Sequence, residues 1–220
     1  MDAALNRDLA QLRVHLRTAL VADALDAIGR RTQCLGSGIL PLQSNVVLVG
    51  RAFTVSAIPA DHPANPPYVG LLKALGEIKA GEVFIYPTGR STRAAVWGEL
   101  VSAACVARGV VGLVTDGLIR DVARVRQLEF PVFSRGHLPY DVNGRLEVLD
   151  QGKVVDIDGV RIAPGDLVIA DDDGVVIVPA DIEAEVIERS LVKDAQERRF
   201  REAVEHGDSA LVAFERFDVL

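Results

Sequence analysis

Near the N-terminus, apolar residues recur at spacings of three and four, which is typical of amphipathic helices. One face of the first predicted helix carries Leu5, Leu9, Leu12 and Leu16. Thr18 is placed to cap a second helix that continues to Ile28 and ends at Gly29. No cluster of ligand-type side chains interrupts either helix, so we expect both to pack against the body of the protein or a second subunit.

The next part of the chain predicts strands. The segment Val46–Ile58 is rich in β-branched residues and predicts one long or bent strand, with Gly50 as a bulge. The proline-rich segment Pro59–Pro67 predicts a loop. Helical spacing follows in Val69–Leu75, and the apolar run Glu82–Tyr86 predicts a further strand.

The middle of the chain alternates between loop, helix and strand. The pattern predicts a loop at Pro87–Arg93, a helix from about Gly98 to Arg108, a strand at Val110–Val114, a turn at Asp116-Gly117, a short helix with Val122 and Val125, and a strand from Pro131 to Phe133. This order, strand, loop, helix and strand, is typical of an α/β fold.

Strands dominate the following segment, and a helix closes the chain. The segment Glu147–Val178 predicts strands only, with turns at Asp158-Gly159, Pro164-Gly165 and Asp173-Gly174. The charged tail Ile182–Val204 predicts a long helix with Asp181 at its start and Gly207 at its end. We therefore expect an α/β sandwich with helices at both chain ends.

Composition and charge narrow the class of protein. The chain has 220 residues, 49% of them hydrophobic and 25% charged, which predicts one domain spanning residues 1–220. The formal net charge of -7 argues against general attraction to nucleic acid or anionic membranes. The segment Met1–Arg13 lacks the apolar core of a signal peptide, and no apolar run approaches a membrane span. Cys34 and Cys105 have no CxxC spacing, so we expect a cytoplasmic protein with two inert, half-buried thiols.

The first candidate site follows the predicted strand Val110–Val114. Its polar end contains Arg120 and Asp121, and ligands in open α/β sheets often bind where strands end. A guanidinium can hold a carboxylate through two hydrogen bonds, and a carboxylate oxygen can hold Mg²⁺. The alternative interpretation of the pair is a surface ion pair or a helix cap.

The second candidate is the start of the helix at Gly98. Backbone N–H groups at a helix N-terminus bind anions, and glycine there lets a ligand approach closely. The alternative is that Gly98 ends a loop and Glu99 merely favours the helix dipole.

Other motifs of catalysis are missing from the sequence. It contains no P-loop, no GxGxxG after a strand, no HExxH and no GxSxG. The four histidines are scattered and are interpreted as surface or packing residues: His15, His62, His137 and His206. The acidic run Asp171–Gly174 is interpreted as a turn before a buried strand.

The two candidate sites belong to a wider series of short motifs. These are Asp23-Ala24-Leu25, Gly50-Arg51-Ala52-Phe53-Thr54-Val55, Gly98-Glu99-Leu100, Arg108-Gly109, Asp116-Gly117 with Arg120-Asp121, Pro131-Val132-Phe133, Pro164-Gly165-Asp166 and Ala170-Asp171-Asp172-Asp173-Gly174-Val175-Val176. In their order and spacing, over most of its length, the chain resembles the class II 4-hydroxy-4-methyl-2-oxoglutarate aldolases and their relative, the regulator of ribonuclease E activity (RraA).

The resemblance implies a swivelling β/β/α sandwich that forms a homotrimer or hexamer, with the active site between subunits. It implies that Arg120 contacts the substrate and that Asp121 ligates Mg²⁺ or Mn²⁺. Glu197, in the C-terminal helix, is the match for an acid that the family site takes from a neighbouring subunit. The backbone that would hold the pyruvate carboxylate is that of Gly98, Glu99, Leu100 and Val101.

The implied reaction is metal-dependent cleavage of a small 2-oxo acid to pyruvate, as an aldolase, an oxaloacetate decarboxylase or both. Cleavage leaves an enolate, which a divalent metal and Arg120 can stabilise. The alternative is a non-catalytic regulator of ribonuclease activity that acts by protein–protein binding. The resemblance implies that the regulator lacks the aspartate found here as Asp121, which favours catalysis.

Because of two loops, the sequence does not determine the identity of the substrate. Pro59–Pro67 differs from the Gly-Asp-Asn pattern of the aldolases, which predicts an altered pocket wall. Arg90 and Arg93 lie in the loop before the Gly98 helix and are candidates to hold a distal carboxylate of the substrate.

Overall fold

The computed structural model describes residues 9–219, so Leu5 of the first predicted helix lies outside the described residues. The helices are α1 (Leu9–His15), α2 (Thr18–Ala27), α3 (Val69–Glu77), α4 (Glu99–Ala107), α5 (Val122–Gln127), α6 (Glu183–Glu205) and α7 (Ala210–Phe217). The strands are β1 (Leu40–Pro41), β2 (Leu48–Pro59), β3 (Glu82–Tyr86), β4 (Ala95–Trp97), β5 (Gly112–Thr115), β6 (Leu118–Ile119), β7 (Val132–Ser134), β8 (Leu146–Gln151), β9 (Val155–Ile157), β10 (Val160–Ile162), β11 (Leu167–Asp171) and β12 (Gly174–Val178).

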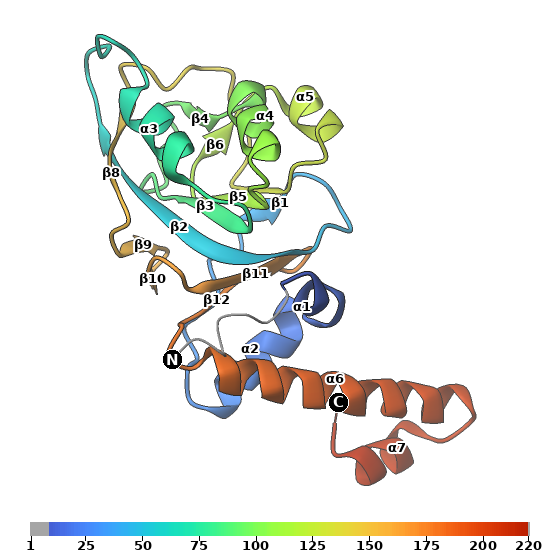
Figure 1. Cartoon of the computed structure of the whole chain (residues 1–220). Coiled ribbons are helices and arrows are strands. Elements are labelled where there is room, and N and C mark those ends of the chain that lie inside the picture. Colours follow the sequence, from blue (N-terminus) through green and yellow to red (C-terminus); the bar gives the residue numbers. More distant parts are fainter. Residues whose placement is uncertain (1–8, 220) are drawn as a thin grey trace.

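One mixed sheet forms the body of the protein (Figure 1). Its strand order is β1-β7-β5-β3-β2-β11-β12, with β8 paired to the second half of β2. The central strands β2, β3, β5 and β7 are parallel, and the other pairs are antiparallel. Because residues 33–35 pair with β12 while β1 pairs with β7, the two edges are linked and the sheet is nearly closed.

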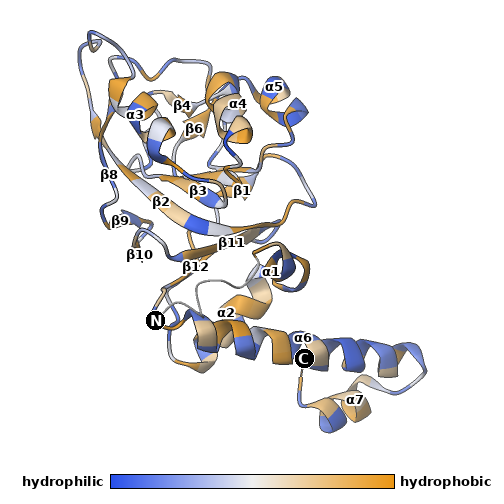
Figure 2. Cartoon of the chain, in the orientation of Figure 1, coloured by the Kyte–Doolittle hydropathy of each residue, from blue (hydrophilic) through white to orange (hydrophobic). Residues whose placement is uncertain are grey.

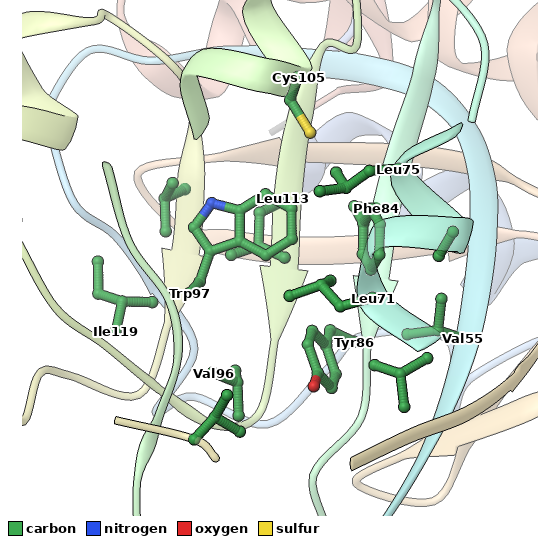
Figure 3. Packing of buried hydrophobic residues seen from close by; sticks show 14 of the residues in the cluster. Val55, Leu71, Leu75, Phe84, Tyr86, Val96, Trp97, Cys105, Leu113 and Ile119 are labelled. Carbon is green, nitrogen blue, oxygen red and sulfur yellow. The ribbon is translucent and has the colours of Figure 1, made fainter. Parts of the chain in front are cut away.

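Buried aromatic residues hold α3 and α4 against one side of the sheet (Figure 3). Val125 of α5 belongs to the same cluster. Trp97, at the end of β4, is 1% exposed and its ring contacts Phe84 edge-on at 4.9 Å between centroids. It also stacks on Phe130 at 6.3 Å. Each such ring contributes roughly 2–3 kcal/mol by burial, so the backbone at the end of β4 is firmly held.

The C-terminal helices extend from the opposite side (Figure 1). The first turns of α6 pack on α2 and the sheet, whereas its far half is hydrophilic (Figure 2). A two-pronged ion pair joins Arg51 of β2 to Glu183, the first residue of α6, and both side chains are largely buried. The helix α7, which the sequence pattern missed, is capped by Ser209.

Two local predictions, for Gly50 and for Thr18, were wrong. Gly50 is no bulge: the register shift falls between Ser56 and Ala57, while Gly50 lies where a side chain would collide with Val83 and Val111. Thr18 does not cap α2. Instead Thr18 is the first residue of α2, and its buried hydroxyl donates to the buried carboxylate of Asp171.

Helix α6 begins at Glu183, and Asp181 provides no side-chain cap. The end of α6 was predicted correctly, because Gly207 follows it with a φ of 105°. None of the helices in residues 9–219 combines the length and apolar character of a membrane span.

Candidate functional site

Two short parallel strands bring the two candidate segments together. β4 ends at Trp97 and leads into Gly98, while β6 ends at Ile119 and leads into Arg120 and Asp121. The strands pair in parallel, with Trp97 opposite Ile119, so both chains leave the pair at the same edge. The Arg120 amide also donates to the Trp97 carbonyl at 2.9 Å.

Asp121 lies directly against the start of α4. Its Oδ2 accepts a hydrogen bond from the Glu99 amide at 3.3 Å and lies 3.8 Å from Nε of Arg120. A methyl group on Gly98 would lie 2.6 Å from the same oxygen. Glycine is therefore required for this close approach.

The backbone of Asp121 is left-handed, with a φ of 58°. Aspartate tolerates this conformation better than most residues, and such strained positions cluster at functional sites. The conformation turns the chain from β6 into α5 and places the carboxylate beside α4.

The N-terminus of α4 is prepared to bind an anion. Gly98 precedes the helix, and the amides of Leu100 and Val101 make no hydrogen bond within residues 9–219. Ser102 fixes this turn, because its hydroxyl accepts from Nε1 of Trp97 at 2.9 Å and donates to the Gly98 carbonyl at 3.0 Å. The free N–H groups and the helix dipole favour a carboxylate here.

Two residues that the sequence did not reveal complete the site. Asp141 accepts from Nη2 of Arg120 at 3.1 Å and from the Tyr68 hydroxyl at 2.6 Å. Burial alone would raise the pKa of Asp141, but the Tyr68 and Asn143 hydrogen bonds and the charge of Arg120 hold that pKa below its ordinary value. Asp141 is thus a fixed negative charge that orients Arg120.

These groups open into a pocket of about 280 Å³. It is lined by Tyr68, Leu71, Leu72, Ala95, Val96, Trp97, Gly98, Leu100, Val101, Arg120, Asp121, Asp141 and Val142. The predicted residues Arg120, Asp121, Gly98, Leu100 and Val101 therefore lie in one pocket, and Glu99 adjoins it through its amide.

The site fits a divalent cation held by few protein groups. Within residues 9–219, no three His, Cys, Asp or Glu side chains converge as a metal cluster. Mg²⁺ often binds through one or two carboxylates and keeps several waters or substrate oxygens. Asp121 lines the pocket with its side chain 45% exposed, which leaves room for such ligands.

Glu197 lies elsewhere in the chain. It is on α6, 4.0 Å from the ammonium of Lys193, and α6 lies beyond the sheet from α4 (Figure 1). Its predicted role at the site of a neighbouring subunit stays a prediction.

Arg90 and Arg93 do not line the pocket. Arg93 pairs with exposed Asp61 at 3.3 Å, and Arg90 pairs with Asp158 at 2.7 Å. In this chain both arginines therefore face protein carboxylates, and their role in holding a distal carboxylate stays a prediction.

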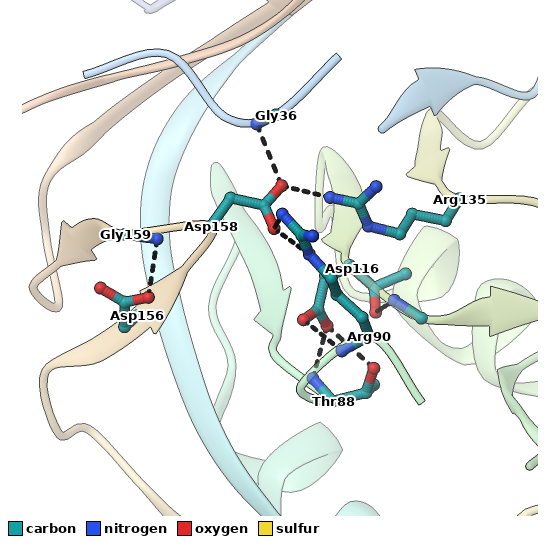
Figure 4. A network of polar contacts seen from close by, with 10 residues as sticks. Gly36, Thr88, Arg90, Asp116, Arg135, Asp156, Asp158 and Gly159 are labelled. Atoms are coloured by element: carbon teal, nitrogen blue, oxygen red, sulfur yellow. Dashed lines mark hydrogen bonds and ion pairs between the residues drawn. The ribbon is translucent and has the colours of Figure 1, made fainter. Parts of the chain in front are cut away.

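A second polar network is structural (Figure 4). Asp158 accepts hydrogen bonds from Arg90, Arg135 and the Gly36 amide. Burial alone would raise the pKa of Asp158, but these partners outweigh burial and hold the pKa below its ordinary value. Asp116 accepts from both the amide and the hydroxyl of Thr88. β5 ends at Thr115 and β6 begins at Leu118, which confirms Asp116-Gly117 as the turn between them.

The remaining polar candidates have structural surroundings. Asp171 accepts two hydrogen bonds from Thr18 at the β11–β12 hairpin, which confirms the interpretation of the acidic run as a turn. The four histidines are all exposed. Cys34 is exposed and Cys105 is buried, so neither is half-buried as predicted. Partial desolvation and the charge of Asp26 raise the pKa of Cys34, and burial raises the pKa of Cys105 to about 12, so neither thiol is activated.

Comparisons with known proteins agree on one family. The RraA-like family model, described as Aldolase/RraA, matches residues 18–177. A "Putative 4-hydroxy-4-methyl-2-oxoglutarate aldolase" of Halalkalibacterium halodurans is 30% identical over 197 residues, which cover 90% of this chain and 89% of that protein. Protein DlpA of Legionella pneumophila is 27% identical over 202 residues; the match covers 92% of this chain and only 32% of DlpA.

Two solved structures have the same fold as this chain. A protein from Pseudomonas syringae pv. tomato, titled uncharacterized, is 31% identical with a TM-score of 0.82, and the match covers 93% of this chain and 95% of that chain. Streptomyces coelicolor RraAS2, titled an unusual member of the RNase ES inhibitor RraA family, is 28% identical with a TM-score of 0.81, covering 88% and 96%. The expected fold is confirmed.

Proposed function

The chain belongs to the RraA-like family, described as Aldolase/RraA, and from this membership we propose a divalent-metal-dependent lyase that cleaves a carbon–carbon bond of a small 2-oxo acid to give pyruvate. The activity is that of an aldolase, an oxaloacetate decarboxylase or both. One observation carries the proposal: Arg120, Asp121 and the free N-terminus of α4 meet in one pocket. A regulator that binds only protein surfaces has no need of this arrangement.

The residues of this chain bind and orient the substrate. The amides of Leu100 and Val101 hold its carboxylate. Arg120, oriented by Asp141, adds a positive charge on the side where negative charge develops as the bond breaks. A Mg²⁺ or Mn²⁺ ion held by Asp121 would supply Lewis acidity for the same charge.

We propose a homotrimer or hexamer in which Glu197 of one subunit faces the pocket of the next. Helix α6 extends from the body on the side away from α4 (Figure 1), so Glu197 is available to a neighbouring subunit and not to its own pocket.

Pyruvate release tests the proposed activity. Full-length protein is treated with chelator and assayed on oxaloacetate and on 4-hydroxy-4-methyl-2-oxoglutarate, with and without Mg²⁺ or Mn²⁺. We expect turnover that depends on the metal. Absence of metal-dependent turnover of both compounds, together with inhibition of a ribonuclease by the same preparation, would support the regulator instead.

A further inference from the structure

Arg120 lies between two carboxylates and engages them unequally. Its Nη2 forms an ion pair with Oδ1 of Asp141 at 3.1 Å, whereas its Nε is 3.8 Å from Oδ2 of Asp121. An arginine that turned its planar fork toward Asp121 would be able to bind both oxygens of that carboxylate. The position of Arg120 therefore decides whether the Asp121 carboxylate is open to another ligand.

In the observed arrangement the Asp121 carboxylate keeps free binding capacity. Its Oδ2 accepts one hydrogen bond, from the Glu99 amide at 3.3 Å, and its Oδ1 accepts none within residues 9–219. A divalent cation requires such a free carboxylate oxygen, whereas a guanidinium on both oxygens would neutralise their charge and cover them. Arg120 and a cation are thus alternative partners of Asp121.

Asp141 is itself fixed by contacts on its other side. Its Oδ2 accepts hydrogen bonds from the Tyr68 hydroxyl at 2.6 Å and from the Asn143 amide at 3.2 Å, which leaves Oδ1 to Arg120. The Asp141 carbonyl accepts from Nη1 of Arg145 at 2.8 Å. Because both its side chain and its backbone are held, Asp141 presents a fixed carboxylate oxygen to the guanidinium.

We propose that Tyr68 and Asp141 are positioning residues that keep Arg120 away from the Asp121 carboxylate and so leave that carboxylate free to bind a divalent cation. The inference rests on the proposed function, in which Asp121 is the metal ligand, and it adds two determinants of metal affinity. All four side chains belong to one subunit. Whatever a neighbouring subunit adds to the pocket, Glu197 included, is common to the wild type and the variants compared below.

Binding of Mn²⁺ alone tests the proposal without any turnover. Tyr68→Phe removes the hydroxyl that fixes Asp141 but changes no charge. Chelator-treated, full-length protein is titrated with Mn²⁺, and the free ion is followed by its electron paramagnetic resonance signal. Tyr68→Phe is expected to bind Mn²⁺ about fivefold more weakly than the wild type, because hydrogen bonds to charged groups are among the stronger ones in proteins. An unchanged dissociation constant overturns the proposal.

Tyr140→Phe is the matched control. Tyr140 precedes Asp141 in the chain, is 59% exposed and does not line the pocket. Its ring centroid lies 5.2 Å from the guanidinium of Arg145, and its hydroxyl makes no hydrogen bond within the described residues. Tyr140→Phe should therefore bind Mn²⁺ like the wild type. Equal weakening in both tyrosine variants would show a general disturbance of this loop and would also overturn the proposal.

A double-mutant cycle tests whether the effect passes through Arg120. Asp141→Asn is expected to weaken Mn²⁺ binding by at least about tenfold, because it releases Arg120 and also removes a negative charge. In Arg120→Gln protein no guanidinium is left to cover Asp121. In that background Tyr68→Phe should change the dissociation constant by less than about twofold and Asp141→Asn by less than about threefold. Undiminished effects in Arg120→Gln protein would contradict the positioning role.

The outcome is separable from the proposed lyase activity. Weaker Mn²⁺ binding by Tyr68→Phe, without pyruvate release by the wild type, would uphold the positioning role and reject the lyase. Metal-dependent pyruvate release with equal Mn²⁺ binding by the wild type and Tyr68→Phe would do the reverse. A wild-type protein that binds no Mn²⁺ would overturn both.

Discussion

At the scale of single residues, Gly98 leaves no room for a side chain beside Asp121 in its present position. A methyl group there would lie 2.6 Å from Oδ2 of Asp121 and 3.1 Å from Cγ of Arg120. Gly98→Ala is expected to displace both side chains and lower kcat/KM by about tenfold or more, measured by pyruvate release.

A second glycine provides the matched control. Gly76, in α3, has no heavy atom within 4 Å of the position that a methyl group would take. Gly76→Ala should keep full activity and stabilise the protein by about 0.5–1 kcal/mol. Equal activity of the two variants would show that close packing at Gly98 has no functional role.

The surroundings of Asp158 predict how the folding stability of the protein changes at low pH. Its folded-state pKa is below the ordinary value because Arg90, Arg135 and the Gly36 amide outweigh burial. Its stabilisation is therefore present above the unfolded-state pKa of about 3.9 and is lost as the pH falls through the lower folded-state value.

Asp158→Asn is expected to lower the free energy of unfolding by about 2 kcal/mol at pH 7. The variant should also lose part of the pH dependence below about pH 4. Urea unfolding between pH 7 and pH 3 measures both effects, with Asp61→Asn, whose side chain is 82% exposed, as the control. An identical loss in both variants would contradict this role for Asp158.

The sequence revealed half of the site at this scale. Gly98 stands at a predicted helix start, and Arg120 and Asp121 lie beyond the predicted strand Val110–Val114 and its turn. Local pattern thus marked their positions, and the family resemblance implied their roles. Tyr68 and Asp141 were missed because they are 73 residues apart and meet only in the folded chain. Tyr68 is also left-handed, with a φ of 61°, which no local rule assigns to tyrosine.

At the scale of elements, one buried ion pair helps to attach α6 to the sheet, beside the apolar contacts of its first turns. Glu183 binds Arg51 of β2 through both carboxylate oxygens, and the two side chains are 10% and 14% exposed. Glu183→Gln leaves Arg51 without its counter-charge and is expected to cost about 3 kcal/mol of stability in denaturant unfolding.

Glu185, two residues further along α6, is the control. It pairs with Arg189 in an exposed i,i+4 pair, so Glu185→Gln should cost less than about 0.5 kcal/mol. Similar losses in both variants would contradict the anchoring role of Glu183.

Long elements were predicted well from the sequence, and short ones were not. The helix over 182–204 was recognised from its long charged sequence and from Gly207 at its end, and the strands over 147–178 from the turns between them. β4 and β6 have three and two residues, which is too few to define a period, and their pairing creates the site. The sequence thus predicted the frame of the fold but not the parallel pair that joins Gly98 to Arg120.

At the scale of the whole molecule, the proposed site between subunits predicts complementation. Asp121→Ala and Glu197→Ala homo-oligomers should both be inactive. When the variants are co-expressed with different tags and assemble at random, half of the pockets keep Asp121, and half of those face an intact Glu197. About a quarter of wild-type pyruvate release is then expected. Mixed oligomers that stay inactive would argue against a shared site.

The central claim is that Asp121 makes this pocket a metal-dependent lyase site. The most direct measurement is pyruvate release during a Mn²⁺ titration of chelator-treated wild-type protein and the Asp121→Ala variant. The expected result is metal-dependent turnover by the wild type and a loss of at least about 100-fold in the variant at every Mn²⁺ concentration. Turnover that needs no metal, or that survives Asp121→Ala, would contradict the claim.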